Sequence, residues 1–291
     1  MIARVQFLAC LLLLLLCGWS GRAGAQDGLT PADQHPWGRF PAGSWKKVRV
    51  CSEAIGAAPG ESAVSTSETT TTLTEADGAG YTLKIEVQVE VGGKKFASEP
   101  RVIHYNYDGQ TDGKKVFCRK VGGAELVVDG QRVRCETRNV EIESDGAKLA
   151  GVIYFSPDLF PYQLRRELKT IGAVEGKAAS TNMETISLGM PCKVLGEVHS
   201  VAYVKTTHLN GAGGSVTMEL HCDDVPGAVV AHSAQDHDAA GKVTRRSTLE
   251  LVDYGLGNLR PDEAWKGRRR FGHRHRGRKM DSSPESPRGG R

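Results

Sequence analysis

Apolar and polar residues alternate strictly from Tyr81 to Val91. Residues 81, 83, 85, 87, 89 and 91 are apolar, whereas the residues between them are polar or charged. Eleven residues of this period predict a long antiparallel strand in the interior of a sheet, with one buried face. Asp77–Gly80 has turn composition and leads back to the β-branched run Thr69–Thr74, which we expect to pair with this strand. Glu86 and Glu90 are expected on its solvated face.

Similar alternation recurs at 216–222 and 247–251, shorter β-rich runs lie elsewhere along the chain, and no segment keeps a helical period for three turns. The pattern at Pro161–Thr170 also alternates and favours a strand. The other predicted strands are 46–51, 102–107, 116–121, 126–133, 148–155, 194–206, 216–222 and 247–251. The sequence therefore predicts a mainly β protein with little helix.

Proline-containing turns recur at Pro100, Pro161 and Pro226, and a Gly-Lys pair follows each of them by 13 to 15 residues. This spacing indicates a hairpin unit used about three times. It is too wide for a propeller blade or a solenoid rung. We expect one curved, half-barrel-like antiparallel sheet of about 10 to 12 strands, because a sheet of this size coils.

The N-terminus carries the features of a secretory signal. Arg4 precedes an apolar run at 7–17, and Ala23-Gly24-Ala25 is a small-residue cleavage site. A lipoprotein signal ending at Cys17 is the alternative, although Leu16 stands where a small residue is preferred. We expect a mature protein exported to the periplasm or the cell exterior, without a membrane-spanning segment. The predicted organisation is a signal at 1–25, a loose leader at 26–40, a β-rich domain at 41–258 and a disordered tail at 259–291.

The charge is concentrated in the tail. Residues 266–291 hold ten Lys and Arg against Asp281 and Glu285, a charge of +8. The whole chain is +4 and the signal adds +2, so the body from 26 to 265 is −6. This acidic body argues against a nucleic-acid-binding domain. The tail suits polyanions such as anionic lipid or acidic glycan, or else it is a solvated tail without a dedicated partner. The expected polyanion-binding residues are Arg268, Arg269, Arg270, Arg274, Arg276, Arg278 and Lys279.

Catalytic and metal-binding signatures are weak. The sequence contains no GxSxG, HExxH or Walker motif. His221-Cys222-Asp223-Asp224 holds four potential ligands, but neighbouring strand residues face opposite sides, so Cys222 is predicted to pack in the core or to form a disulfide. His232 and His237 are interpreted as parts of a solvated hairpin loop. We therefore expect no cofactor, no metal and no enzymatic activity.

Five cysteines follow the expected cleavage site, and the chain has no CxxC motif. Export permits disulfides, but two bridges and one spare thiol could be arranged in 15 ways. The pairing stays open. The residues concerned are Cys51, Cys118, Cys135, Cys192 and Cys222.

Several segments together resemble a group of uncharacterised exported bacterial β-rich proteins. The resemblance rests on His35–Phe40, Gly43–Trp45, 156–167, Val225–Gly227 and Ser247–Leu251, and it covers most of 35 to 255. The overall β pattern is also similar to the periplasmic lipoprotein-carrier superfamily, which holds acyl chains in a half-barrel. That likeness implies helices over the concave face, and the sequence predicts none. No functional residue is transferred.

These observations favour an exported, non-enzymatic binding module of the cell envelope. Its concave sheet face would hold an apolar ligand, such as a lipid, or a partner segment, and its tail would contact polyanions. An adhesion or scaffold module without a ligand pocket is the alternative. A large apolar concave face would favour the first, and a filled, closed sandwich core would favour the second.

Overall fold

A computed structural model describes residues 29–56, 62–107, 114–144, 147–172 and 178–257. These residues belong to the first of two units of the chain, Met1–Asn258. The predicted signal segment and the basic tail lie outside the described residues.

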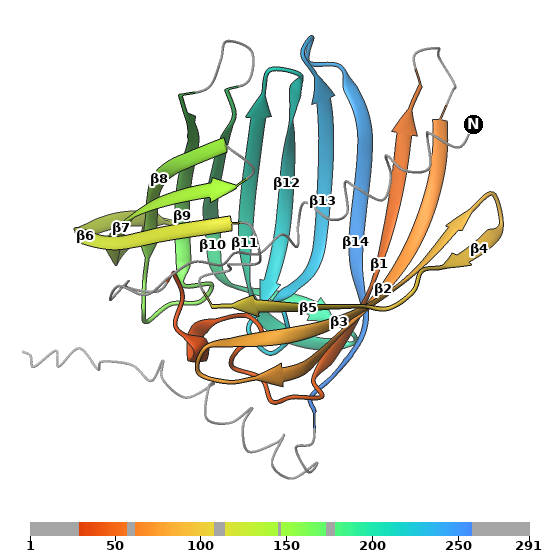
Figure 1. The fold of residues 1–291 in the computed structure, drawn as a ribbon, viewed down its shortest axis with the longest axis horizontal. Coiled ribbons are helices and arrows are strands. Elements are labelled where there is room, and N and C mark those ends of the chain that lie inside the picture. Colours follow the sequence, from red (N-terminus) through yellow and green to blue (C-terminus); the bar gives the residue numbers. More distant parts are fainter. Residues whose placement is uncertain (1–28, 57–61, 108–113, 145–146, 173–177, 258–291) are drawn as a thin grey trace, which may run out of the picture. The chain divides into compact units, whose positions relative to one another are not determined.

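The described residues form one open antiparallel sheet of fourteen strands, and their only helical element is the 3₁₀ turn η1 (Ala32–Gln34) (Figure 1). None of the described residues belongs to a helix long and apolar enough to cross a membrane. The predicted mainly β, curved antiparallel fold is therefore confirmed. The strands are β1 (Trp45–Ile55), β2 (Ser62–Ala76), β3 (Gly80–Val91), β4 (Lys94–Ala97), β5 (Arg101–Asn106), β6 (Lys114–Val128), β7 (Gln131–Ser144), β8 (Ala147–Phe155), β9 (Gln163–Ile171), β10 (Ser180–Val194), β11 (Glu197–Asn210), β12 (Gly213–Cys222), β13 (Val229–Asp238) and β14 (Val243–Gly255).

The strand order follows the chain almost throughout. It runs β4-β3-β2-β1-β14-β13-β12-β11-β10-β9-β8-β7-β6, and β5 also pairs with β3. Successive strands are thus joined as hairpins, and the pairing of β1 with β14 joins the early strands to the late ones. The edges of this path are β4 and β6.

The buried face of β3 follows the predicted alternation. Leu83 is 1% exposed, and Tyr81 and Ile85 are also buried, whereas Val91 at the far end of the strand is 47% exposed. The β-branched run in β2 pairs with it, with Thr69 opposite Val87. Glu86 and Glu90 lie on the solvated face, as predicted, and form ion pairs with Lys84 and Lys95.

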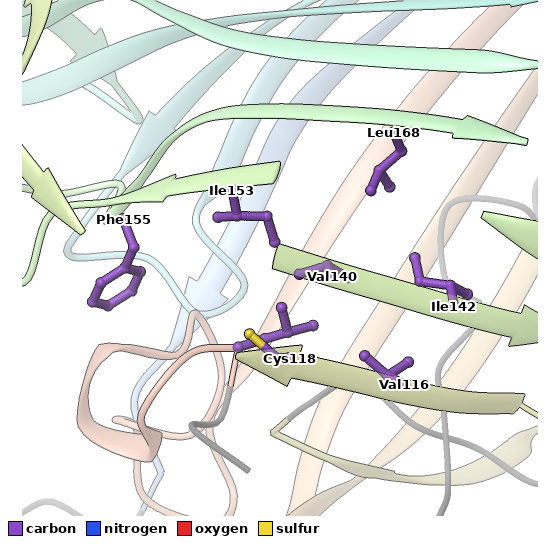
Figure 2. Packing of buried hydrophobic residues seen from close by; sticks show 8 residues of the cluster. Val116, Cys118, Val140, Ile142, Ile153, Phe155 and Leu168 are labelled. Atoms are coloured by element: carbon purple, nitrogen blue, oxygen red, sulfur yellow. The ribbon is translucent and has the colours of Figure 1, made fainter. Parts of the chain in front are cut away.

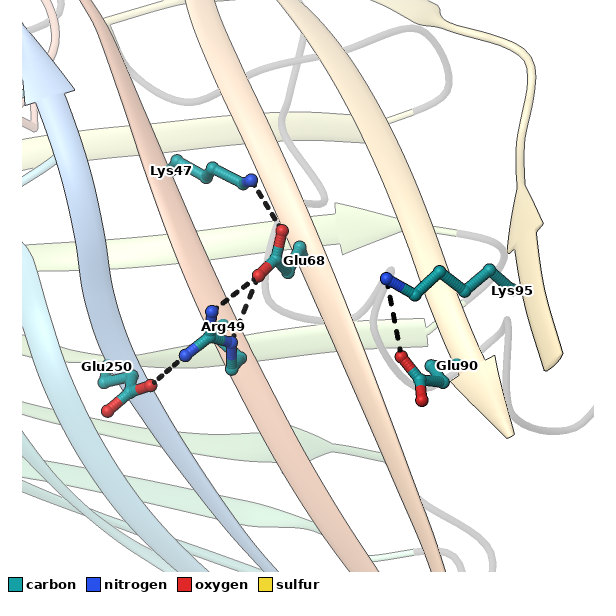
Figure 3. Close-up of polar contacts among 6 residues, drawn as sticks. All are labelled: Lys47, Arg49, Glu68, Glu90, Lys95 and Glu250. Carbon is teal, nitrogen blue, oxygen red and sulfur yellow. Dashed lines mark hydrogen bonds and ion pairs between the residues drawn. The ribbon is translucent and has the colours of Figure 1, made fainter. Parts of the chain in front are cut away.

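The same solvated face continues over β2, β1 and β14, where it carries further exposed ion pairs (Figure 3). Arg49 bridges Glu68 and Glu250, and Lys47 also contacts Glu68. Pairs in such exposed positions contribute at most about 1 kcal/mol each. They identify this as the water-facing side of the sheet, which we call the outer face.

Two of the predicted strands are placed differently in the structure. Residues 126–133, expected as one strand, contain the turn of the β6–β7 hairpin, because Asp129 and Gly130 adopt φ of 50° and 73°. Residues 194–206 likewise span the β10–β11 turn at Leu195 and Gly196. In both cases apolar residues flank a two-residue turn, so the apolar run continues through the reversal.

The sheet bends around the N-terminal segment, residues 29–44. Leu29 packs in one apolar cluster with Phe155 on β8, and Trp37 packs in another with Leu83 on β3. In a flat sheet, the nine strand spacings from β8 to β3 would measure about 43 Å. The eight residues from 29 to 37 span at most about 28 Å when extended. The sheet is therefore curved, and we call the face toward this segment the inner face.

Each end of the inner face is apolar. The cluster at the β6–β9 end contains Leu29 together with the residues shown in Figure 2: Val116, Cys118, Val140, Ile142, Ile153, Phe155 and Leu168. Arg138 lies against it, with its guanidinium carbon 3.9 Å from the Phe155 ring centroid and its Nη1 donating to the Leu29 carbonyl. At the β3 end, Trp37 and Phe40 pack against the sheet, as predicted.

The predicted hairpin unit used about three times is replaced in the structure by a four-strand unit that occurs twice. The first residues of β6, β7, β8 and β9 are 114, 131, 147 and 163, and those of β10, β11, β12 and β13 are 180, 197, 213 and 229. Every pair differs by 66 residues. The Ser156–Gln163 and Cys222–Val229 turns share a bond from the first amide to the seventh carbonyl, of 2.7 and 2.8 Å. The prolines that suggested a repeat, Pro161 and Pro226, are not equivalent positions, because the 66-residue offset places Pro161 at Gly227.

Candidate ligand-binding face

Two rows of side chains cross the middle of the inner face. The first inner row is defined by consecutive register pairs and consists of Val204, Glu219, His232, Leu249, Val50, Ser67 and Val89. The second inner row lies two residues along each strand and consists of Arg166, Met183, Thr206, Thr217, Ala234 and Ser247. Several members on β11–β14, including Thr206, Thr217, Ala234 and Ser247, stay half-buried.

Glu219 is the acidic centre of this face. Its Oε2 lies 3.0 Å from the Nε2 of His221, and both side chains are less than a fifth exposed. Burial favours the neutral carboxyl, but the hydrogen bond with His221 and the positive charges of His232 and Lys46 outweigh it. The pKa of Glu219 is therefore held below its usual value, and the carboxylate is the stable form at neutral pH.

Lys46 approaches Glu219 from β1. Its ammonium group lies deep in the fold, although the residue as a whole keeps some exposed surface. The Nζ atom donates to the carbonyls of Gly227 and Val229 at 3.2 Å and lies 5.8 Å from the Trp37 ring centroid. Burial lowers its pKa to about 8, and the charge of Glu219 opposes this shift.

The guanidinium of Arg166 on β9 lies deep in the fold, although the residue as a whole keeps some exposed surface, and part of its hydrogen-bonding capacity is unsatisfied. Its Nε is buried and has no hydrogen-bond partner. Burial lowers the pKa of the guanidinium, while the charge of Glu219 acts in the opposite direction. The buried hydroxyl oxygens of Thr185 and Thr69, on the same face, also lack partners. An unpaired buried donor of this kind costs free energy unless a further group satisfies it.

His232 corrects the interpretation from the sequence. It was expected in a solvated loop, but it lies in β13 on the inner face, between Glu219 and Leu249 in the register. Burial is the largest effect and lowers the pKa of His232. The charge of Glu219 opposes this shift, and the charge of Arg245 adds to it. His237 belongs to the same strand, whose turn is held by Asp238 through the amides of Ala240 and Lys242.

The run at 221–224 is divided among different sites. His221 faces inward to Glu219, whereas Cys222 is fully buried among apolar residues, as predicted. Arg39 of the N-terminal segment donates to the carboxylate and the carbonyl of Asp223. Asp224 contacts His199 on β11, with 2.9 Å between its Oδ2 and the Nδ1.

His199, Cys222 and Asp224 form a cluster that the sequence did not indicate. One potential ligand atom from each lies within 4.8 Å of the others. His199 and Cys222 are 23 positions apart in the sequence, and the pairing of β11 with β12 brings them together. Burial, the largest effect, raises the pKa of Cys222 to about 11. A protonated and fully buried thiol is unsuited to act as a nucleophile.

The five cysteines whose pairing the sequence left open all belong to the described residues, and none of them forms a disulfide in this structure. The seven predicted polyanion-binding residues, 268 to 279, lie outside the described residues.

No protein-family model matches this chain, and no curated protein matches it in sequence. Three solved structures are similar. A proposed exported protein with a YmcC-like fold from Bacteroides fragilis is 9% identical, with 74% of this chain and 98% of that chain covered and a TM-score of 0.31. A proposed lipoprotein from Parabacteroides distasonis is 10% identical over 74% and 96%, with a TM-score of 0.31. A proposed outer membrane lipoprotein-sorting domain from Vibrio parahaemolyticus is 10% identical over 78% and 90%, with a TM-score of 0.28.

These neighbours are of the two kinds that the sequence resembles, namely exported proteins and a lipoprotein-sorting domain.

Proposed function

We propose that the protein is an exported, non-enzymatic binding module of the cell envelope, and that its inner face holds an amphipathic ligand with an acidic group. The acidic group would pair with Arg166, and the apolar part would lie along the apolar members of the inner face. The observation that carries this proposal is the buried Arg166 guanidinium with an unsatisfied donor.

A deeply placed cation with an unsatisfied donor is costly for a protein that only has to fold, and the charge of Glu219 offsets only part of the cost of burial. Structural roles would be served as well by a methionine or leucine at position 166. An anionic ligand would satisfy the donor and recover a charge-assisted hydrogen bond. The register neighbours of Arg166 are the buried Met183 and Ile153, and beyond Met183 the second inner row continues with the smaller, half-buried side chains of Thr206, Thr217 and Ala234.

The apolar part of the ligand would contact four half-buried residues of the inner face. These are Leu249 on β14, Val50 on β1, and Val87 and Val89 on β3. Leu249 pairs with Val50, and Ser67 joins Val50 to Val89 in the register, so the patch is continuous. The described strands form one sheet, so no second sheet fills this face as in a closed sandwich, which favours a ligand over a scaffold role.

The test compares oleate with oleyl alcohol, which share an apolar chain and differ in the acidic group. We expect Arg166→Met to weaken oleate binding by about 10- to 100-fold, the effect of losing a charge-assisted hydrogen bond, and to leave oleyl alcohol binding unchanged. Arg165→Met is the matched control, because Arg165 is 49% exposed and ion-paired with Glu167. Equal oleate affinity in wild type and Arg166→Met, measured by titration calorimetry, would contradict the proposal.

We also propose that the basic tail adds electrostatic affinity for anionic lipid or acidic glycan. Its support is the charge of +8 over residues 266–291, next to a body of −6. In this arrangement the tail would hold the protein near an anionic surface while the inner face exchanges its ligand.

A further inference from the structure

The two four-strand units allow each residue of the second to be compared with its counterpart 66 positions earlier. The apolar cores match closely: Val194 corresponds to Val128, Val201 to Cys135, Val225 to Leu159 and Val230 to Leu164, and all eight are buried or packed in the two corresponding clusters. The corresponding core positions of the two units are therefore filled by apolar side chains.

At three buried or half-buried positions of this core, the second unit carries a potential metal ligand where the first unit carries none. Leu126 of the first unit corresponds to Cys192, Val133 to His199, and Ser156 to Cys222. Asp224 corresponds to Asp158, so the acidic residue is present in both units. The first unit shows that the fold can be built without the cysteines and the histidine.

The substituted side chains lie on one side of neighbouring strands. His199, Cys222 and Asp224 have ligand atoms within 4.8 Å of one another. Cys192 is the register partner of His199 across β10 and β11, which places their Cβ atoms about 5 Å apart on the same face. Cys192 also packs against the cluster that contains Cys222.

We propose that these four side chains bind a zinc ion: Cys192, His199, Cys222 and Asp224. Thiolate, imidazole and carboxylate are the ligands of tetrahedral zinc sites, where the donor atoms are separated by about 3.5 Å. Small side-chain rotations would bring the three clustered atoms to that separation. Asp224 is 43% exposed and Cys222 is fully buried, so the site has a route from solvent and an apolar floor.

The test uses the mature protein with its thiols reduced and zinc as the only added metal. After gel filtration, elemental analysis should find one zinc ion per chain, and zinc should raise the melting temperature. Cobalt in place of zinc should give the absorption of a cobalt–thiolate bond, which reports cysteine ligation directly.

The variants restore the residues of the first unit: His199→Val, Cys222→Ser and Cys192→Leu. Because the first unit folds with these residues, we expect the variants to fold. Each should lower zinc affinity at least 100-fold and abolish the zinc-dependent rise in melting temperature. Cys51→Ser is the control, because Cys51 is an exposed cysteine on β1, outside the cluster.

Zinc binding that survives His199→Val and Cys222→Ser would overturn the proposal. So would a wild-type protein that binds no zinc with free thiols. A disulfide between Cys192 and Cys222 in protein isolated from the envelope, found by peptide mapping without reduction, would also overturn it by assigning the two cysteines another role.

Discussion

Side-chain direction at single residues separates the two faces of this protein. Glu219 and His221 point inward to the charged centre, whereas their neighbours Leu220 and Cys222 lie in an apolar cluster. The alternation of β12 and the burial of Cys222 were predicted from the sequence. The burial of the Glu219 carboxylate on the inner face could not be predicted, because polar residues on a strand ordinarily face water. Only the curvature of the sheet turns this polar side into a partly enclosed one.

Lys46 gives this charged centre a measurable signature. Its folded-state pKa of about 8 is below the unfolded value of 10.5. Between these pH values the unfolded chain holds a proton that the folded protein has released, so raising the pH stabilises the fold. The free-energy cost of burying the charged ammonium group is fully present below pH 8 and is lost above pH 10.5. This cost amounts to about 3 kcal/mol for a pKa shift of this size.

Urea denaturation of wild type and Lys46→Met should show this difference. The free energy of unfolding of wild type, relative to the variant, should rise by most of that amount between pH 7.5 and 10.5. A difference between the two proteins that stays constant over this range would show that the Lys46 ammonium group is not buried.

At the scale of elements, the strands with a clear pattern were predicted, and two tight turns were missed. β3 and β9 alternate and β8 is a β-rich run, and the bounds of each were predicted within two residues. The β6–β7 turn at Asp129-Gly130 carries the Asp-Gly signal of a two-residue hairpin, which was available in the sequence. The β10–β11 turn at Leu195-Gly196 carries no such signal, and the repeat alone would have revealed it.

The repeat also predicts a stabilising substitution at that turn. Leu195 adopts φ of 47° and is 47% exposed, so it bears the strain of the left-handed region without packing in the core. Its counterpart Asp129 adopts φ of 50°, and Asp tolerates this region better. Leu195→Asp should raise the free energy of unfolding by about 1 kcal/mol.

The reciprocal variant, Asp129→Leu, should lower the free energy of unfolding by a similar amount. Thermal denaturation of both variants checks the pair. Equal stability of Asp129→Leu and wild type would show that the two turns do not share one energetic requirement.

At the scale of the whole molecule, the sequence predicted the class of fold and its curvature from the number of strands. The N-terminal segment was expected to be loose apart from Trp37 and Phe40. In the described residues it also supplies Leu29 to the β6–β9 cluster and Arg39 to the β12–β13 turn. These contacts join residues more than 80 positions apart, so local patterns could not predict them.

The charge distribution leads to a prediction about the tail. Truncation after Trp265 should leave the melting temperature nearly unchanged, because residues 266–291 contain one aromatic residue and no apolar periodicity. It should abolish binding to anionic vesicles that full-length protein shows at low salt and loses as salt shortens the Debye length from about 10 Å at 0.1 M to about 3 Å at 1 M. Truncated protein that still binds such vesicles in low salt, or that does not fold, would contradict the electrostatic role.

The central claim is that the inner face holds an anionic amphiphile through Arg166. Native mass spectrometry of the protein purified without denaturation from the envelope of its own cells tests this directly. We expect wild type and Arg165→Met to carry an added mass that ionises as an acidic lipid after release, and Arg166→Met to lose it. Wild-type protein that carries no ligand, or a ligand of equal occupancy in Arg166→Met, would contradict the claim.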